Sequence, residues 1–135
     1  MTNEEKAYLA GIIDGEGSIM LIRFHSNQQP APCICIASIS IELLEWVRNK
    51  TGFGAIKSKK NYKPTIHENS YTYEAKYNDA VTLLEIIEPY LVIKQKRLRA
   101  QHILLHYKKL TLRNGRYTKG QLEAKNQFYK EFLTL

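Results

Sequence analysis

The sequence predicts an α+β domain in which one four-stranded antiparallel sheet carries helices on one face. Apolar residues repeat at helical and strand-like spacings in the order helix, strand, strand, helix, strand, strand, helix, followed by two more helices. The 135 residues suffice for one domain with a modest core, and they show no linker, low-complexity tract or second copy of the pattern. We therefore interpret residues 1–135 as a single domain whose other sheet face meets water or a ligand.

The first half of the chain contains a helix, two strands and a second helix. Thr2 forms a capping box with Glu5, which predicts a helix over about 3–13. Two segments then alternate like strands on either side of a proline-containing loop, and helical spacing returns before Gly52, a common signal for a helix C-terminus. The predicted ranges are 18–24 and 33–39 for the strands and 40–50 for the helix.

The second half repeats the strand pair and ends in helices. Tyr71, Tyr73 and Tyr77 share one side of the last strand, and we expect them to pack beneath the sheet rather than to stack on bases. The predicted ranges are 53–60 and 70–77 for strands, and 78–88, 94–110 and from Thr118 onward for helices.

Basic residues are concentrated in one part of the chain. Lys and Arg number 20 against 13 acidic residues, a net charge of +7. Residues 57–119 contain 14 basic and 5 acidic residues, whereas the rest contains 6 and 8. Such a segment favours a polyanionic ligand, with a solvated cationic surface as the alternative.

Several protein classes are disfavoured. The longest stretch without a strongly polar residue, about 33–41, is far shorter than the roughly 20 apolar residues that cross a bilayer. The N-terminus resembles neither a signal peptide nor a transit peptide. Cys33 and Cys35 alternate with isoleucines and match neither a disulfide framework nor a CxxC metal pair, so we interpret them as small strand residues in a reducing compartment. These features predict an intracellular protein without a membrane partner.

Two acidic residues stand where the first helix is expected to end. Asp14 and Glu16 face the negative end of the helix dipole, which disfavours each by roughly 0.3–1 kcal/mol. A bound divalent cation such as Mg²⁺ would relieve this conflict; alternatively the acids solvate a turn. Ala7, Gly11 and Gly15 fall four residues apart, so one stripe of this helix has almost no side chain and permits close helix packing.

Three segments resemble one protein family. The stretch LAGIIDGEG at 9–17 is similar to the motif that names the LAGLIDADG homing endonucleases. Residues 43–54 resemble the family's second helix with the G-x-G that precedes its third strand, and residues 88–94 (EPYLVIK) resemble its PYL-x-x-K element. The matches occur in the family's order. They imply an αββαββα fold with a saddle-shaped sheet, and site-specific cleavage of double-stranded DNA.

The resemblance also implies a homodimer. Members of the family with one motif pair their first helices across a two-fold axis, so a single motif implies two identical subunits and a long, near-palindromic target. The residues expected at this interface are Ala7, Leu9, Ala10, Gly11, Ile12 and Asp14.

The resemblance further assigns the catalytic centre. Glu16 occupies the position of the essential metal-binding acid, with the Gly15 carbonyl beside it, and Asp14 has a secondary, structural and metal-binding role. Lys94 matches the active-site lysine, and Ser38 stands where the family often has Gln or Asn to position water. Mg²⁺ (or Mn²⁺) between two carboxylates would activate water and stabilise charge on the phosphate.

The open sheet face is the expected DNA contact. A strand of about seven residues spans about seven base pairs, so two subunits cover on the order of 20 base pairs. The register of the first strand stays open, because one alignment turns the apolar Met20 and Ile22 toward DNA and a bulge would reverse it. The candidate contacts are Arg23, Gln28, Lys57, Lys59, Lys60, Lys63, Thr72, Glu74, Lys76 and Lys96.

Other functions stay open at this stage. An inactive DNA-binding regulator or an RNA splicing maturase on the same fold is the main alternative, and a maturase would bind RNA. The acid at position 16 favours the enzyme. We expect an intracellular host compartment, with the bacterial or phage cytoplasm and an organelle (mitochondrion or chloroplast) left as alternatives. His102 and His106 lie four residues apart but lack a third metal ligand, which favours a surface or packing role over a metal site.

Overall fold

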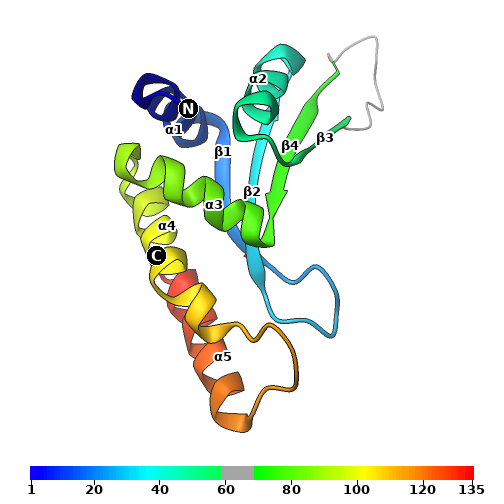
Figure 1. Cartoon of the computed structure of the whole chain (residues 1–135), viewed down its shortest axis with the longest axis vertical. Helices are drawn as coiled ribbons and strands as arrows, with labels where there is room; N and C mark the ends of the chain where they lie inside the picture. Colours follow the sequence, from blue (N-terminus) through cyan, green and yellow to red (C-terminus); the bar gives the residue numbers. More distant parts are fainter. Residues whose placement is uncertain (59–68) are drawn as a thin grey trace.

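The computed structural model describes residues 1–58 and 69–135 and has the predicted α+β architecture (Figure 1). Within these described residues, a four-stranded antiparallel sheet is combined with five α-helices. The elements in chain order are α1 (Asn3–Glu16), β1 (Gly17–Ile22), β2 (Ala31–Ser38), α2 (Ile41–Thr51), β3 (Ala55–Ser58), β4 (Tyr71–Lys76), α3 (Tyr77–Ile87), the 3-10 turn η1 (Glu88–Tyr90), α4 (Lys94–Leu110) and α5 (Lys119–Leu133).

The sheet has the strand order β1-β2-β4-β3, and the helices pack against one of its faces (Figure 1). Side chains at alternate positions of each strand enter the core formed with these helices, as the period of two requires. Ile19, Ile34, Ile36 and Tyr73 are at most 1% exposed. The intervening residues lie on the opposite side of the sheet, which we call the outer face.

Most element boundaries differ from the sequence prediction by one or two residues, and two of the differences affect the candidate site. Helix α1 continues to Glu16 instead of ending near Ile13, so both acidic residues belong to its last turn. Tyr77 is not a strand residue; it has a left-handed backbone (φ 54°) and begins α3 directly after β4. Tyr73 is buried as expected, but Tyr77 remains 39% exposed because the chain turns there.

The turn between α2 and β3 depends on Gly54. Its φ of +92° lies in the left-handed region, and a Cβ on this residue would stand 2.5–2.6 Å from the ring of Tyr73. That ring is fully buried, and its hydroxyl donates a hydrogen bond of 3.0 Å to the Phe53 carbonyl. The ring therefore has no room to move away. By contrast, Gly52 also has a positive φ (+80°) but has open space around it.

We expect Gly54→Ala to destabilise the fold by about 2–4 kcal/mol, since it combines backbone strain with a steric clash against a buried ring. Gly52→Ala serves as the matched control and should cost only about 1–2 kcal/mol, from the left-handed backbone alone. Urea unfolding of both variants measures the difference. Equal losses would contradict the role of Tyr73.

The C-terminal helices pack against each other through aromatic rings. His102 on α4 stacks on Phe128 of α5 with centroids 4.7 Å apart, and its Nε2 lies 2.9 Å from the Phe128 carbonyl oxygen. These contacts agree with a packing role for His102. No helix in the described part of the chain has both the length and the apolar character that a membrane crossing needs.

Candidate nucleic-acid interface and acidic site

The end of α1 presents two acidic side chains with different surroundings. Asp14 accepts hydrogen bonds from the backbone N–H groups of Val92 (2.9 Å, to Oδ2) and Ile93 (3.1 Å, to Oδ1). Glu16 is exposed and makes no hydrogen bond or ion pair within residues 1–58 and 69–135. The structure therefore ties Asp14 to the segment before α4 and leaves the Glu16 carboxylate facing solvent.

The conflict with the helix dipole is relieved by Lys96. Its Nζ donates hydrogen bonds to the carbonyl oxygens of Ile13 (2.8 Å) and Asp14 (2.6 Å). These carbonyls belong to the last turn of α1, where cations are favoured. Lys96 was expected to contact DNA, but its ammonium group is occupied inside the protein. The sequence around α1 gives no signal for this role, because α1 has no basic residue in its own last turn and Lys96 comes from α4, far along the chain.

We expect Asp14→Asn to lower the free energy of unfolding by about 1–3 kcal/mol, because an amide cannot accept from both backbone N–H groups in this geometry. Glu16→Gln is the control, since Glu16 has no partner in the described chain and its change should cost less than about 0.5 kcal/mol. Urea melts of the two variants compare the acids directly. A stable Asp14→Asn protein would remove the anchoring role of Asp14.

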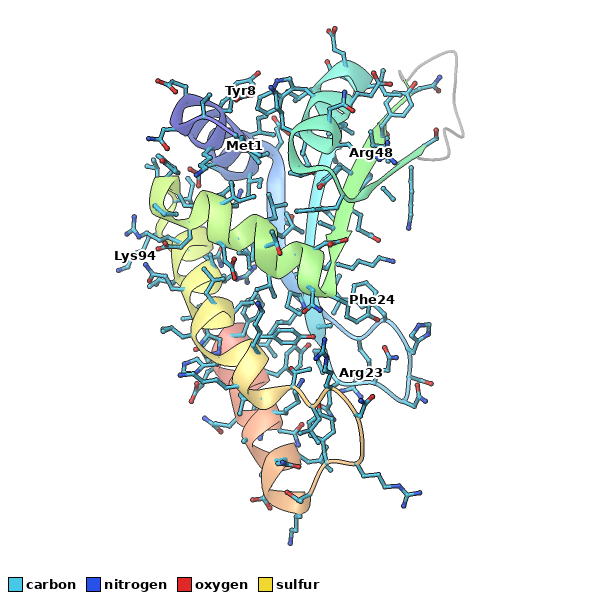
Figure 2. The ribbon with its side chains drawn as sticks, in the orientation of Figure 1. Met1, Tyr8, Arg23, Phe24, Arg48 and Lys94 are labelled. Atoms are coloured by element: carbon cyan, nitrogen blue, oxygen red, sulfur yellow. The ribbon has the colours of Figure 1, made fainter. Side chains whose placement is uncertain are left out.

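Lys94 and Ser38 are each close in the chain to a residue that contacts or pairs with the end of α1 or the residue after it. Lys94 is the first residue of α4, directly after the Ile93 amide that Asp14 holds, and its side chain is exposed (Figure 2). Ser38 ends β2, two residues beyond Ile36, which pairs with Gly17 directly after α1. Its hydroxyl accepts a hydrogen bond of 3.0 Å from the Ser40 N–H, so the oxygen keeps its own proton to donate.

One side of α1 is exposed and nearly free of side chains. Ala7, Gly11 and Gly15 are all exposed, and a Cβ on either glycine would meet no atom within 4 Å. Tyr8, 56% exposed, stands next to this stripe with its ring against Trp46 (Figure 2). The outward side of α1 is therefore available for contact with another helix.

The structure revises the expected dimer interface. Leu9 and Ala10 are fully buried in the protomer's own core, and Ile12 is only 8% exposed. Because α1 packs its other side against η1, α3 and the sheet, these three residues cannot also face a partner. Ala7 and Gly11 stay at the surface, and Gly15 joins them.

The pairing registers define the outer face of the sheet. Ser18 lies opposite Cys35, Met20 opposite Cys33, Cys35 opposite Glu74, and Glu74 opposite Ala55. The first strand has no bulge in its pairing with β2, and Ile19 and Leu21 are buried, so Met20 and Ile22 belong to the outer face. This face consists of Ser18, Met20, Ile22, Cys33, Cys35, Ala37, Ala55, Lys57, Thr72, Glu74 and Lys76.

The charged residues of the outer face are paired around Glu74. Its Oε1 lies 2.9 Å from Nζ of Lys76 and 3.4 Å from Nζ of Lys57. Partial burial acts to raise the pKa of Glu74, but the hydrogen bonds and charges of the two lysines outweigh it and hold the pKa below its usual value. Thr72, which pairs with Lys57, completes the polar part of this face.

The remaining predicted contacts lie near the loop that follows β1. Arg23 is exposed, and Phe24 lies beside it with Lys76 Nζ 4.8 Å from its ring centroid (Figure 2). The Gln28 Oε1 accepts a hydrogen bond of 3.1 Å from the Tyr77 hydroxyl, which leaves its amide N–H groups unengaged by the described residues. Lys59, Lys60 and Lys63 lie outside the described residues.

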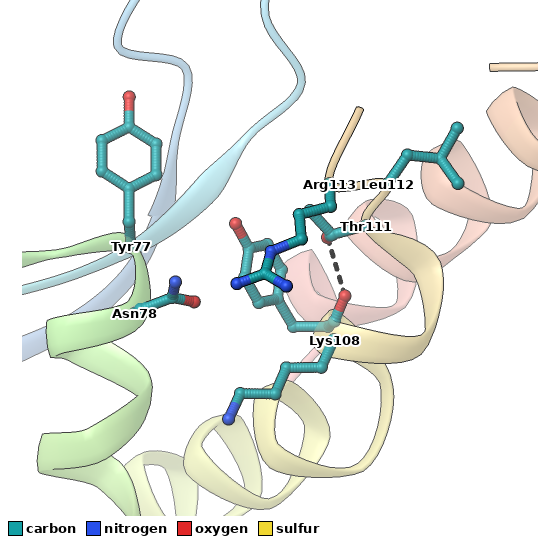
Figure 3. Close-up of a pocket in the computed structure, with 7 residues that line it drawn as sticks. Tyr77, Asn78, Lys108, Thr111, Leu112 and Arg113 are labelled. Atoms are coloured by element: carbon teal, nitrogen blue, oxygen red, sulfur yellow. Dashed lines mark hydrogen bonds between the residues drawn. The ribbon is translucent and has the colours of Figure 1, made fainter. Parts of the chain in front are cut away.

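A separate groove lies between α3 and the end of α4. It is lined by Tyr77, Asn78, Tyr107, Lys108, Thr111, Leu112 and Arg113. Figure 3 shows Lys108 and Arg113 beside it, and the Thr111 hydroxyl donates to the Tyr107 carbonyl (2.7 Å). None of the residues predicted from the sequence to bind metal or DNA lines this groove.

No protein-family model matches the sequence, and no curated protein matches it. Solved structures do resemble it. The homing endonuclease I-CvuI, in complex with its target in the presence of Ca, has a TM-score of 0.69 at 17% identity, over 98% of this chain and 82% of that chain. The archaeal intron-encoded homing endonuclease I-Vdi141I, complexed with DNA, has a TM-score of 0.66 at 18% identity, over 98% and 84%. The chain has the fold of the homing endonucleases.

A third structural neighbour, I-SmaMI, has a much longer chain than this protein. I-SmaMI, bound to an uncleaved DNA target in the presence of calcium ions, matches with a TM-score of 0.66 at 19% identity. The match covers 99% of this chain but only 45% of I-SmaMI. One copy of this chain thus corresponds in fold to less than half of that protein.

Proposed function

We propose that two copies of this chain form a metal-dependent, site-specific double-strand DNA endonuclease of the single-motif LAGLIDADG type. The observation that carries the proposal is the position of Glu16. It lies exposed and without a partner in the described chain, at the end of a helix whose outward stripe has almost no side chains. The fold shared with the homing endonucleases supports the same assignment.

A homodimer would bring two such carboxylates together. Helices that meet through Ala7, Gly11 and Gly15 can approach backbone to backbone, and a two-fold axis running roughly along both helices would set the same end of each helix beside its copy. The correspondence with less than half of I-SmaMI supports a need for two copies. Within the described residues, neither Asp14 nor Glu16 belongs to a cluster of three metal-ligating side chains.

The residues at the end of α1 suit a hard divalent cation. The Glu16 carboxylate would be the principal ligand, with the neighbouring Gly15 carbonyl beside it, whereas Asp14 positions the segment that leads to Lys94. Bound Mg²⁺ or Mn²⁺ would lower the pKa of a coordinated water and stabilise charge on the scissile phosphate. Lys94 would add positive charge, and the Ser38 hydroxyl could hold a water through its free proton.

The substrate would be a long duplex lying across the outer faces of both subunits. Lys57, Thr72 and Lys76 supply polar groups there, and Met20 with Ile22 offers apolar contact to thymine methyl groups. Arg23, the Gln28 amide and the basic residues Lys59, Lys60 and Lys63 would extend the contact, largely to phosphates. A symmetric dimer requires a near-palindromic target.

Incubation of the protein with a plasmid library of random sites and Mg²⁺ tests this function. We expect a single family of long, near-palindromic sequences to be cut on both strands, and no cutting when EDTA removes the metal. Tight, sequence-selective binding without cleavage would indicate a DNA-binding regulator instead. Selective binding of structured RNA without DNA cleavage would indicate a maturase.

A further inference from the structure

Two thiols and a carboxylate converge on the outer face of the sheet. The Sγ atoms of Cys33 and Cys35 lie 3.7 Å apart, and the Cys35 Sγ lies 3.7 Å from Oε2 of Glu74. All three ligand atoms fall within 4.8 Å of one another. The sequence spacing alone indicated no metal site here, because the third member comes from β4, 39 residues further along the chain.

The two 3.7 Å distances match the distances between ligand atoms around a tetrahedral zinc ion. Zn–S bonds of about 2.3 Å at a tetrahedral angle place two sulfurs about 3.8 Å apart, and a Zn–O bond of about 2.1 Å gives a sulfur–oxygen separation of about 3.6 Å. The Sγ–Sγ distance and the distance from Cys35 Sγ to Glu74 Oε2 agree with these values, and the Cys33 and Glu74 ligand atoms lie within 4.8 Å of each other. Three protein ligands leave one position for water.

The charges around Glu74 suit the same ion. Oε1 is held by Lys57 and Lys76, while the other oxygen, Oε2, faces the thiols. The two lysines therefore orient the carboxylate as outer-shell partners do at metal centres. A divalent ion with two thiolates and one carboxylate has a net charge of about −1, which the neighbouring ammonium groups balance.

We propose that Cys33, Cys35 and Glu74 form a binding site for Zn²⁺, or another thiophilic divalent ion, that cross-links β2 to β4. Binding releases the two thiol protons, so affinity rises with pH. The location of this ion on a DNA-contacting surface rests on the proposed function, whereas the ion site itself does not.

Titration of the reduced full-length protein with Co²⁺, in excess Mg²⁺ and without DNA, tests the site. We expect one Co²⁺ per chain, with a thiolate-to-cobalt charge-transfer band and the visible bands of tetrahedral cobalt, both removed by Zn²⁺. Bound Zn²⁺ should also protect Cys35, the more accessible of the two thiols, from a thiol reagent. Absence of the charge-transfer band from the unmodified protein would overturn the proposal, whether or not the protein cuts DNA.

Single substitutions test the contribution of individual ligands to Co²⁺ binding. We expect Cys35→Ser to lose most of the charge-transfer band and Glu74→Gln to weaken Co²⁺ binding by at least about tenfold. Glu85→Gln is the matched control, since Glu85 is an exposed glutamate on α3 that also lies near a lysine (Lys108, 3.8 Å), and it should bind Co²⁺ as the unmodified protein does. Unchanged affinity in Glu74→Gln would overturn the three-ligand site.

Discussion

The Glu16→Gln dimer should bind the selected DNA target and fail to cut it. Glutamine keeps the size of the side chain but removes the negative charge that would hold the divalent ion. If that ion supplies about 4 kcal/mol of transition-state stabilisation, its loss slows cleavage about a thousandfold. Single-turnover cleavage of the selected site measures the rate, and a gel-shift assay in Ca²⁺ measures binding separately.

The structure also supplies the controls for this experiment. Glu16 is exposed and has no partner in the described chain, so its replacement should leave the urea midpoint unchanged. Glu123→Gln removes another exposed carboxylate, on α5 and away from α1 (Figure 1), and should cut at the normal rate. A Glu16→Gln protein that still cuts would remove Glu16 from the catalytic centre, and a Glu123→Gln protein that fails would indicate a general effect of charge.

Gly11→Leu should convert the dimer to a folded monomer that does not cut DNA. Gly11 is exposed and has open space around it, so the leucine fits within one chain. Exchange of glycine for leucine in a helix even favours the isolated helix by about 0.5–1 kcal/mol. The same side chain would hold two α1 helices apart at the point where the proposed interface needs direct backbone contact. Cleavage is lost because each separated chain has only one Glu16.

Sedimentation equilibrium measures this change directly. We expect the unmodified protein to sediment at about 31 kDa, twice the chain mass of 15.7 kDa, and Gly11→Leu at the mass of one chain. Gly120→Leu is the matched control, because Gly120 is another exposed helical glycine with no atom within 4 Å of a built Cβ. It should remain a dimer and cut normally. A dimeric Gly11→Leu protein would place the interface on a different surface.

Much of the fold could be predicted because the signals that define it are local. Alternation in the strands identified the outer-face positions of Lys57, Thr72, Glu74 and Lys76, which the registers place together. The capping box at Thr2 and the start of α4 at Lys94 were also predicted correctly. Each of these features depends on residues within a few positions of one another, so the chain order alone determines it.

The candidate site depended more on contacts between distant residues. The acids at 14 and 16 look equivalent in the sequence, but only the approach of residues 92 and 93 separates an anchored carboxylate from a free one. The same holds for Lys96, whose place at the end of α1 is set by the packing of α4. The sequence predicted too many dimer-interface residues on α1. This helix is apolar on more than one side, and periodicity alone does not show which side packs into the protomer's own core.

By itself, the sequence determined the order of elements, the alternating sheet faces and the acidic end of the first helix, since propensity, capping and periodicity act over short distances. Only the tertiary structure decided which polar groups meet. It paired Asp14 with backbone amides, left Glu16 unpartnered in the described chain, and set Glu74 beside Cys35 across two strands. The physical reason is that hydrogen bonds, charges and metal ligands act through space, and the folding of the chain sets those distances.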